Sequence, residues 1–317
     1  MNKNHSLKIT SRRKFLRTSA SVSGAALLSS GSLLAETDSV FSSKGNSTHN
    51  QDQRYKIGVC DWMILKRQNP EAFRTAGEIG ADGVEVDMGK LGNRTTFENK
   101  LLNPVERNRF LSEARKYKLE ICSIAMSGFY AQSFPERKNV EIMIRDTVNT
   151  MVLLGVKNAF LPLGVKGDLV KFPELRPKII ERLKLAGEMA LVAGVVIGIE
   201  TTLDAAGETK LLEEVNSPAI KSYFNFANAL QHGRDLIREI KTLGKENICQ
   251  IHCTDEDGVW LENNKRLDMH KVKGVLDEIG WSGWLVIERS RDSNNPGNVI
   301  KNFSANTQYL KSVFQNQ

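Results

Sequence analysis

Histidine is scarce in this 317-residue chain, and its scarcity excludes metal clusters that need many histidine ligands. Of the five histidines, His5 and His49 lie among the first fifty residues, which leaves His232, His252 and His270 for the rest. His232 and His270 lie in polar stretches beside predicted helix starts, where we expect surface positions. His252 ends the apolar run ICQIH. We therefore take His252 as the candidate metal ligand.

Paired cysteines and glycine-rich phosphate loops are also lacking. The sequence GVCD at residues 58–61 follows the first apolar run, and it supplies no glycine-rich turn, which argues against a doubly wound nucleotide-binding sheet. Zinc-finger spacing is missing because the cysteines form no C-x-x-C pair, so buried apolar roles are expected for them. A disulfide stays open, since an exported chain would meet an oxidising compartment. The four cysteines are Cys60, Cys122, Cys249 and Cys253.

The chain has almost no excess of positive charge once residues 1–35 are set aside. The whole chain has 44 Lys and Arg against 37 Asp and Glu, a net charge of +7. Residues 1–35 contain six of these bases and no acid, so the remainder has 38 bases against 37 acids, a net charge of +1. A surface that binds phosphates should leave a positive excess on the folded domain. We therefore expect no nucleic-acid partner.

Residues 1–35 resemble a twin-arginine export signal. Arg12 and Arg13 are followed by Phe15 and Leu16 and then by a weakly apolar, Ser- and Gly-rich stretch up to residue 35. This stretch is too short and too polar for a stable transmembrane helix, so no membrane span is expected after processing. The resemblance implies a periplasmic protein, or a membrane-tethered one if the signal is not cleaved. The polar residues 36–53 are expected to form a disordered linker.

Residues 54–317 alternate extended apolar runs with amphipathic ones. This alternation predicts repeated βα units. Eight such units make an α/β fold, a (β/α)8 barrel that forms a single domain. The predicted strands begin at Tyr55, Asp82, Leu119, Val156, Val195, Ala219, Asn247 and Trp284. The predicted helices cover residues 70–80, 104–117, 137–154, 173–193, 208–215, 234–243, 268–279 and 298–314.

Four of the later predicted strands end in a residue that can bind a metal. The runs VVIGIE, AIKSYFN, ICQIH and WLVIE end at Glu200, Asn225, His252 and Glu288. The carboxyl ends of barrel strands meet at one mouth, where such folds place their chemistry. Unpaired buried carboxylates would be costly there. The pattern therefore predicts a metal site.

Together with GVEVD at residues 83–87, YFNFAN at 223–228 and IHCTD at 251–255, these motifs resemble the xylose-isomerase-like barrel superfamily of sugar phosphate isomerases and epimerases. The resemblance covers residues 55–314. It implies one divalent metal ion, manganese, cobalt, magnesium or zinc, bound by Glu200, Asn225, His252 and Glu288. It also implies that Glu200 and Glu288 are catalytic, acting as acid and base on opposite faces of a small-molecule carbohydrate. A homo-oligomer is a further expectation from the family.

Asn225 departs from the family, whose members often carry aspartate at this position. An amide oxygen is a competent metal ligand. With a neutral His252, however, the ligand charge falls to −2, which weakens metal binding. A degenerate site that has lost its metal is the alternative.

A ketose presents a carbonyl and a neighbouring hydroxyl that can chelate one cation, which makes the adjacent carbon more acidic. One carboxylate then removes a proton, a metal-bound enediolate forms, and the second carboxylate returns a proton. The predicted function is a divalent-metal-dependent sugar isomerase or epimerase. Two alternatives stay open: a lyase that cleaves 3-keto-glycosides by β-elimination at the same site, and a non-catalytic sugar-binding barrel.

Further residues around the predicted mouth are candidates for substrate binding. Trp62 follows the first strand, where an indole can stack on a sugar face. Trp260 lies in the loop after His252 and would form a lid wall. Asp255 is also placed to orient the His252 ring. The full set is Trp62, Glu85, Asn228, Asp255, Trp260 and Arg289.

Overall fold

The computed structural model describes residues 53–315, so the predicted export signal and nearly all of the predicted linker lie outside the described residues. Within that range, parallel strands form a closed barrel in chain order, and Tyr55 on the first strand pairs with Gly283 on the last. The predicted (β/α)8 barrel is confirmed. The strands are β1 (Tyr55–Cys60), β2 (Gly83–Asp87), β3 (Glu120–Ala125), β4 (Asn158–Pro162), β5 (Val196–Glu200), β6 (Ile220–Asn225), β7 (Ile248–His252) and β8 (Gly283–Ile287).

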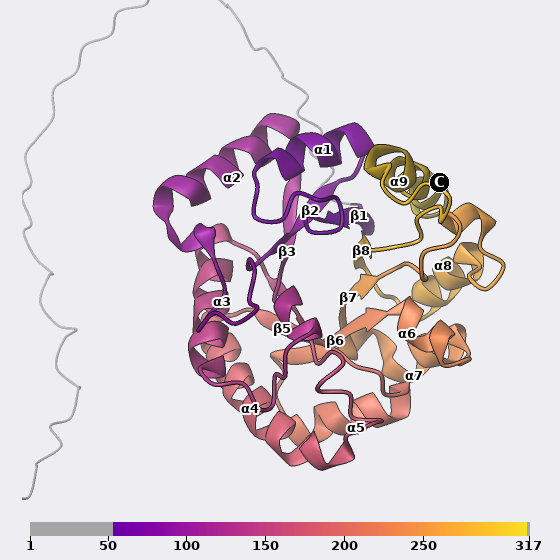
Figure 1. The fold of residues 1–317 in the computed structure, drawn as a ribbon. Coiled ribbons are helices and arrows are strands. Elements are labelled where there is room, and N and C mark those ends of the chain that lie inside the picture. The colour runs from indigo at the N-terminus through magenta and orange to yellow at the C-terminus, as the bar shows by residue number, and fades with distance from the viewer. Residues whose placement is uncertain (1–52, 316–317) are drawn as a thin grey trace, which may run out of the picture. The chain divides into compact units, whose positions relative to one another are not determined.

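Helices surround the barrel as an outer ring, and Figure 1 shows α9 lying beside α1, where the first and last units meet. The main helices are α1 (Glu71–Ile79), α2 (Pro104–Tyr117), α3 (Val140–Leu154), α4 (Arg176–Ala193), α5 (Ala205–Val215), α7 (Leu236–Asn247), α8 (Met269–Glu278) and α9 (Val299–Phe314). A short helix, α6 (Phe226–Gln231), directly follows β6, and single turns of 3-10 helix occur at Lys100–Leu102, Ser127–Tyr130, Pro173–Leu175 and Leu261–Asn263. No helix in the described part of the chain is long and apolar enough to cross a membrane.

Local chemistry sets the helix ends. Gly80 and Gly194 end α1 and α4 with φ of 85° and 67°, a left-handed conformation that glycine adopts without a steric penalty. α5 begins three residues before the predicted start at Glu208. There the side chain of Asp204 accepts a hydrogen bond from the backbone N–H of Gly207 and caps the helix. α6 was not predicted from the sequence.

Candidate active site

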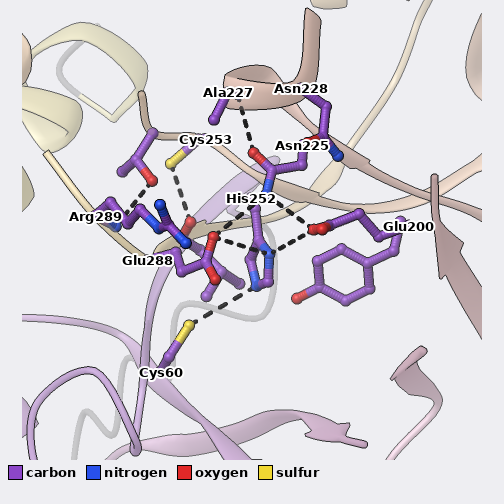
Figure 2. Close-up of polar contacts among 12 residues, drawn as sticks. Cys60, Glu200, Asn225, Ala227, Asn228, His252, Cys253, Glu288 and Arg289 are labelled. Carbon is purple, nitrogen blue, oxygen red and sulfur yellow. Dashed lines mark hydrogen bonds and ion pairs between the residues drawn. The ribbon is translucent and has the colours of Figure 1, made fainter. Parts of the chain in front are cut away.

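The carboxyl ends of β5 to β8 bring the four predicted ligands together. Glu200, Asn225 and His252 are the last residues of their strands, and Glu288 directly follows β8. Asn225 Nδ2 donates hydrogen bonds to Glu200 Oε2 (2.8 Å) and to Glu288 Oε2 (3.2 Å). His252 Nδ1 lies 3.5 Å from Glu200 Oε2 and 3.8 Å from Glu288 Oε2. Figure 2 shows these four side chains, which we call the mouth cluster, pointing toward one another.

Below the mouth cluster, the barrel interior holds a fully buried set of polar side chains. Glu85 Oε1 on β2 lies 3.1 Å from His252 Nε2. Glu85 Oε2 accepts hydrogen bonds from the hydroxyls of Ser123 and Tyr223. Gln250 Nε2 donates to both of these hydroxyl oxygens, each at 2.8 Å. We call Glu85, Ser123, Tyr223 and Gln250 the deep network, and each of them is 0% exposed.

The deep network decides which nitrogen of His252 faces the mouth. A carboxylate only accepts hydrogen bonds, so Nε2 must carry the proton that it donates to Glu85. Nδ1 is buried and has no hydrogen-bond partner among the described residues. Buried polar atoms without a partner are uncommon in folded proteins. Metal-binding histidines usually donate their other N–H to a carboxylate, which is the arrangement that Glu85 and His252 form.

Negative charge accumulates around the His252 ring. Burial by itself would lower the pKa of His252, but the charges of Glu85 and Glu288, together with the polar contacts of the ring with Glu200 and Glu85, outweigh burial and raise this pKa to about 10. The pKa of Glu288 is raised mainly by burial; the charge of His252 lowers it, and the neighbouring Glu200 raises it further. The site therefore attracts positive charge. A proton on the ring and a metal ion would compete for it, because a histidine must be neutral to bind a metal.

The donor set fits a divalent cation through three side chains. The carboxylates of Glu200 and Glu288 converge from the ends of two strands on Nδ1 of His252, which accepts no hydrogen bond from the described residues. Carboxylate and imidazole donors suit manganese, cobalt and zinc. Asn225, the fourth predicted ligand, turns its amide nitrogen toward the two carboxylates, because its Oδ1 accepts the backbone N–H of Ala227 (2.9 Å).

A second group of ligand types lies deeper. One ligand atom from each of Cys60, Glu85 and His252 lies within 4.8 Å of the others, and all three residues are buried. Burial raises the pKa of Cys60 well above its usual value, as does the nearby charge of Glu85, so the protonated thiol is favoured. Metals bind the thiolate. Both oxygens of Glu85 also already accept hydrogen bonds, so this group fits a structural network better than a metal site.

Aromatic rings wall one side of the mouth cluster. Trp62 stacks on Phe160, with ring centroids 6.3 Å apart and an interplanar angle of 9°, and lies edge-on to His252. Phe160 and Tyr223 pack against His252 with centroids 4.7 and 4.6 Å away. Trp62, a predicted substrate residue, is thus beside the mouth cluster, and its ring helps to shield the His252 ring from water.

Two other predicted substrate residues are engaged elsewhere. Asp255 accepts hydrogen bonds from the guanidinium of Arg266 at 2.7 and 2.9 Å and pairs with it as an ion pair. The carboxylate that contacts the His252 ring is Glu85, so Asp255 does not occupy the ring-orienting place expected for it. The indole N–H of Trp260 donates to Asn302 Oδ1 on α9 (2.8 Å).

Asn228 and Arg289 lie next to mouth-cluster residues. Asn228 Nδ2 donates to the backbone carbonyl of Thr201, the residue that follows Glu200 (3.1 Å). The charge of Glu288 raises the pKa of Arg289 although burial alone would lower it. Figure 2 shows the Arg289 side chain beside Glu288.

The deep network contains residues that the sequence analysis did not single out. Tyr223 and Gln250 each stand two positions before a mouth-cluster residue on the same strand. Side chains in a strand alternate between its two faces, so residues two apart point the same way. A polar residue two positions before a predicted site residue on the same strand was therefore the sequence signal that could have identified Tyr223 and Gln250.

Known proteins share this fold. The family model described as the xylose isomerase-like TIM barrel matches residues 73–312. A 2-epi-5-epi-valiolone 7-phosphate 2-epimerase from Actinoplanes sp. is 23% identical over 206 residues, which are 63% of this chain and 72% of that protein. The D-psicose 3-epimerase from Clostridium cellulolyticum H10 superposes with a TM-score of 0.66 at 13% identity, covering 82% of this chain and 100% of the other. The 3-keto-D-glucoside 4-epimerase from E. coli has a TM-score of 0.62 at 15% identity, covering 81% and 99%.

Proposed function

This chain belongs to the xylose isomerase-like TIM barrel family, and from that premise we propose that it is a divalent-metal-dependent sugar epimerase or isomerase. The observation that carries the proposal is the convergence of two carboxylates, Glu200 and Glu288, on a buried Nδ1 of His252 that has no hydrogen-bond partner among the described residues. Relatives and structural neighbours named as epimerases support the same class of reaction.

Glu200, His252 and Glu288 would hold the cation. When bound, the cation would polarise the sugar carbonyl and stabilise the negative charge that develops on its oxygen. The deep network fixes the orientation of His252, so that its Nδ1 faces the two carboxylates. Trp62 offers an indole face on which an apolar face of a sugar can stack.

The two glutamates would move the proton. Their contacts with Asn225 and His252 use Oε2 of each carboxylate, so we assign Oε1 to proton transfer. We assign Glu200 as the base that removes a proton from the carbon beside the carbonyl, and Glu288 as the group that returns a proton on the opposite face. Return of a proton from the opposite face inverts that carbon. Because the N-terminal sequence predicts export, we expect unphosphorylated sugars as substrates.

Deuterium exchange from heavy water tests this proposal. The full-length chain, loaded with Mn²⁺ or treated with a chelator, would be given free ketoses, their phosphates and 3-keto-glycosides. We expect metal-dependent deuterium incorporation next to a carbonyl. Release of the aglycone would instead assign a lyase, which begins with the same proton abstraction, and the absence of exchange with every sugar would favour a non-catalytic sugar-binding barrel.

Glu200→Gln should lower the exchange rate about 10²- to 10⁴-fold, because an amide cannot accept the proton. Glu213→Gln, the same change at an exposed position of α5, is the matched control and should exchange as the unmodified chain does. Far-UV circular dichroism would check that both variants are folded. Retained exchange in Glu200→Gln would contradict the assignment of the base.

A further inference from the structure

The side-chain amide of Asn225 is held from both ends. At the start of α6, Asn225 is the N-cap, and its Oδ1 accepts the backbone N–H of Ala227 at 2.9 Å. At the other end, Nδ2 donates to Oε2 of Glu200 and of Glu288, at 2.8 and 3.2 Å. Figure 2 shows the amide between Ala227 and the two carboxylates. All three contacts require the same orientation of the amide.

Turning the Asn225 amide over would lose all three contacts. Nδ2 would then face the N–H of Ala227, donor against donor, and Oδ1 would face the two carboxylates, acceptor against acceptors. Asn225 is only 6% exposed, so water has little access to replace the lost hydrogen bonds. Buried polar groups that lose their partners are costly. The amide therefore keeps its nitrogen toward the carboxylates. Because an amide nitrogen donates hydrogen bonds and has no available lone pair, it cannot coordinate a cation.

We propose that Asn225 is a positioning residue that clamps Glu200 and Glu288 and caps α6, and that the chain offers a divalent cation three ligands, Glu200, His252 and Glu288. The metal part of this inference rests on the proposed function, whereas the clamp holds with or without a metal. Two carboxylates and a neutral imidazole carry a charge of −2, which balances one divalent cation. An aspartate at position 225 would cap the helix with one oxygen and offer the other to the cation.

Proton NMR of the Asn225 amide separates a clamp from a ligand. In the full-length, ¹⁵N-labelled chain, the side-chain NH₂ pair of Asn225 is identified by its disappearance in Asn225→Ala. We expect this pair to exchange slowly with water both without metal and after addition of Zn²⁺. A pair that exchanges rapidly in the metal-free chain, or becomes rapid on Zn²⁺ addition, would overturn the proposal, because the amide would then have left the carboxylates.

Zn²⁺ titration by calorimetry tests the three-ligand site. Asn225→Asp should bind Zn²⁺ at least tenfold more tightly than the unmodified chain, because it supplies a fourth ligand and a further negative charge. Asn103→Asp is the matched control: Asn103 caps α2 through the backbone N–H of Val105 (2.8 Å) and lies outside the mouth cluster, so its affinity should be unchanged. A gain of less than tenfold at position 225 would contradict the three-ligand site.

The two experiments also separate this inference from the proposed function. If the unmodified chain binds no Zn²⁺ or Mn²⁺ and the Asn225 amide pair is nevertheless protected, the clamp stands and the metal-dependent reaction falls. If Zn²⁺ binds and the amide pair is released, the metal site stands and the clamp falls.

Discussion

The two sides of the His252 ring differ in how completely their polar groups are satisfied. On the deep side, Nε2 contacts Glu85, and the other oxygen of Glu85 accepts hydrogen bonds from Ser123 and Tyr223. On the mouth side, Nδ1 has no hydrogen-bond partner within residues 53–315, and the two carboxylates beside it share one amide.

Burial alone does not separate the two sides, because the side chains of the mouth glutamates are only 10% and 15% exposed. The difference lies in what remains to be bound. A polar group that the chain already satisfies holds the structure, and one that the chain leaves unsatisfied is available to a ligand. We therefore expect substitutions in the mouth cluster to lower the rate of the reaction. Substitutions in the deep network should weaken metal binding or lower the stability of the fold.

The largest effect should follow a change on the mouth side. Glu288→Gln keeps the shape of the side chain and an acceptor for Asn225, but it removes the group that gives and takes the proton. We expect kcat to fall about 10²- to 10⁴-fold, with the urea unfolding curve little changed. Steady-state kinetics with the best substrate from the exchange panel would measure this. A fall in kcat of less than tenfold would show that Glu288 does not transfer the proton.

A buried carboxylate on α5 extends the comparison between satisfied and unsatisfied polar groups to a residue outside the mouth cluster. Glu208 is 4% exposed and accepts a hydrogen bond from the hydroxyl of Thr201 (2.7 Å), while its Oε1 has no partner in the described range. Burial is the main reason that its pKa is raised from 4.5 to about 7. Near neutrality Glu208 is thus poised to hold a proton.

This raised pKa makes stability depend on pH with a definite sign. A carboxyl group whose folded-state pKa lies above its unfolded value stabilises the fold fully below about pH 4.5, and that contribution is lost as pH rises through 7. The loss amounts to about 3 kcal/mol by pH 8. Glu208→Gln should remove this part of the pH dependence, as measured by urea unfolding at pH 5, 7 and 8. If Glu208→Gln and the Glu213→Gln control gave the same pH profile, Glu208 would not be the group responsible.

On the deep side, Glu85→Gln should act through His252. The variant keeps an oxygen for Nε2 but loses the negative charge that makes the ring a stronger ligand. We expect metal affinity to fall about 10- to 100-fold, as for other carboxylates that contact a ligating histidine. Zn²⁺ calorimetry would measure the loss, and saturating metal should restore most of the activity. Activity that stayed low at saturating metal would mean that Glu85 acts on the substrate instead.

The sequence predicted the barrel and the mouth cluster because both follow from periodic patterns. Strand starts agree within two residues, from Tyr55 in β1 to Gly283 in β8. The convergence of Glu200, His252 and Glu288 followed from a simple rule, that parallel strands end at one mouth.

The deep network depends on neighbours across the barrel, which periodicity does not show. Glu85 and His252 are 167 residues apart in the chain. The nearer carboxylate, Asp255, instead pairs with Arg266, which lies eleven residues beyond it. The orientation of Asn225 depended on the N–H of Ala227 in α6, a helix too short to be recognised by its pattern. Sequence spacing thus located the site but did not identify which side chains orient the ligands.

The smallest predicted effect comes from Tyr223→Phe, which tests whether the deep network is structural. The change removes one donor to Glu85 and one acceptor for Gln250, while Ser123 still serves both. We expect a loss of about 1 kcal/mol in the free energy of unfolding. Zn²⁺ affinity should change less than threefold, because the contact between Glu85 and His252 remains. Tyr117→Phe on α2 is the control for the loss of a hydroxyl outside the network. A tenfold loss of affinity in Tyr223→Phe would show that the hydroxyls, and not Glu85 alone, set the position of the ring.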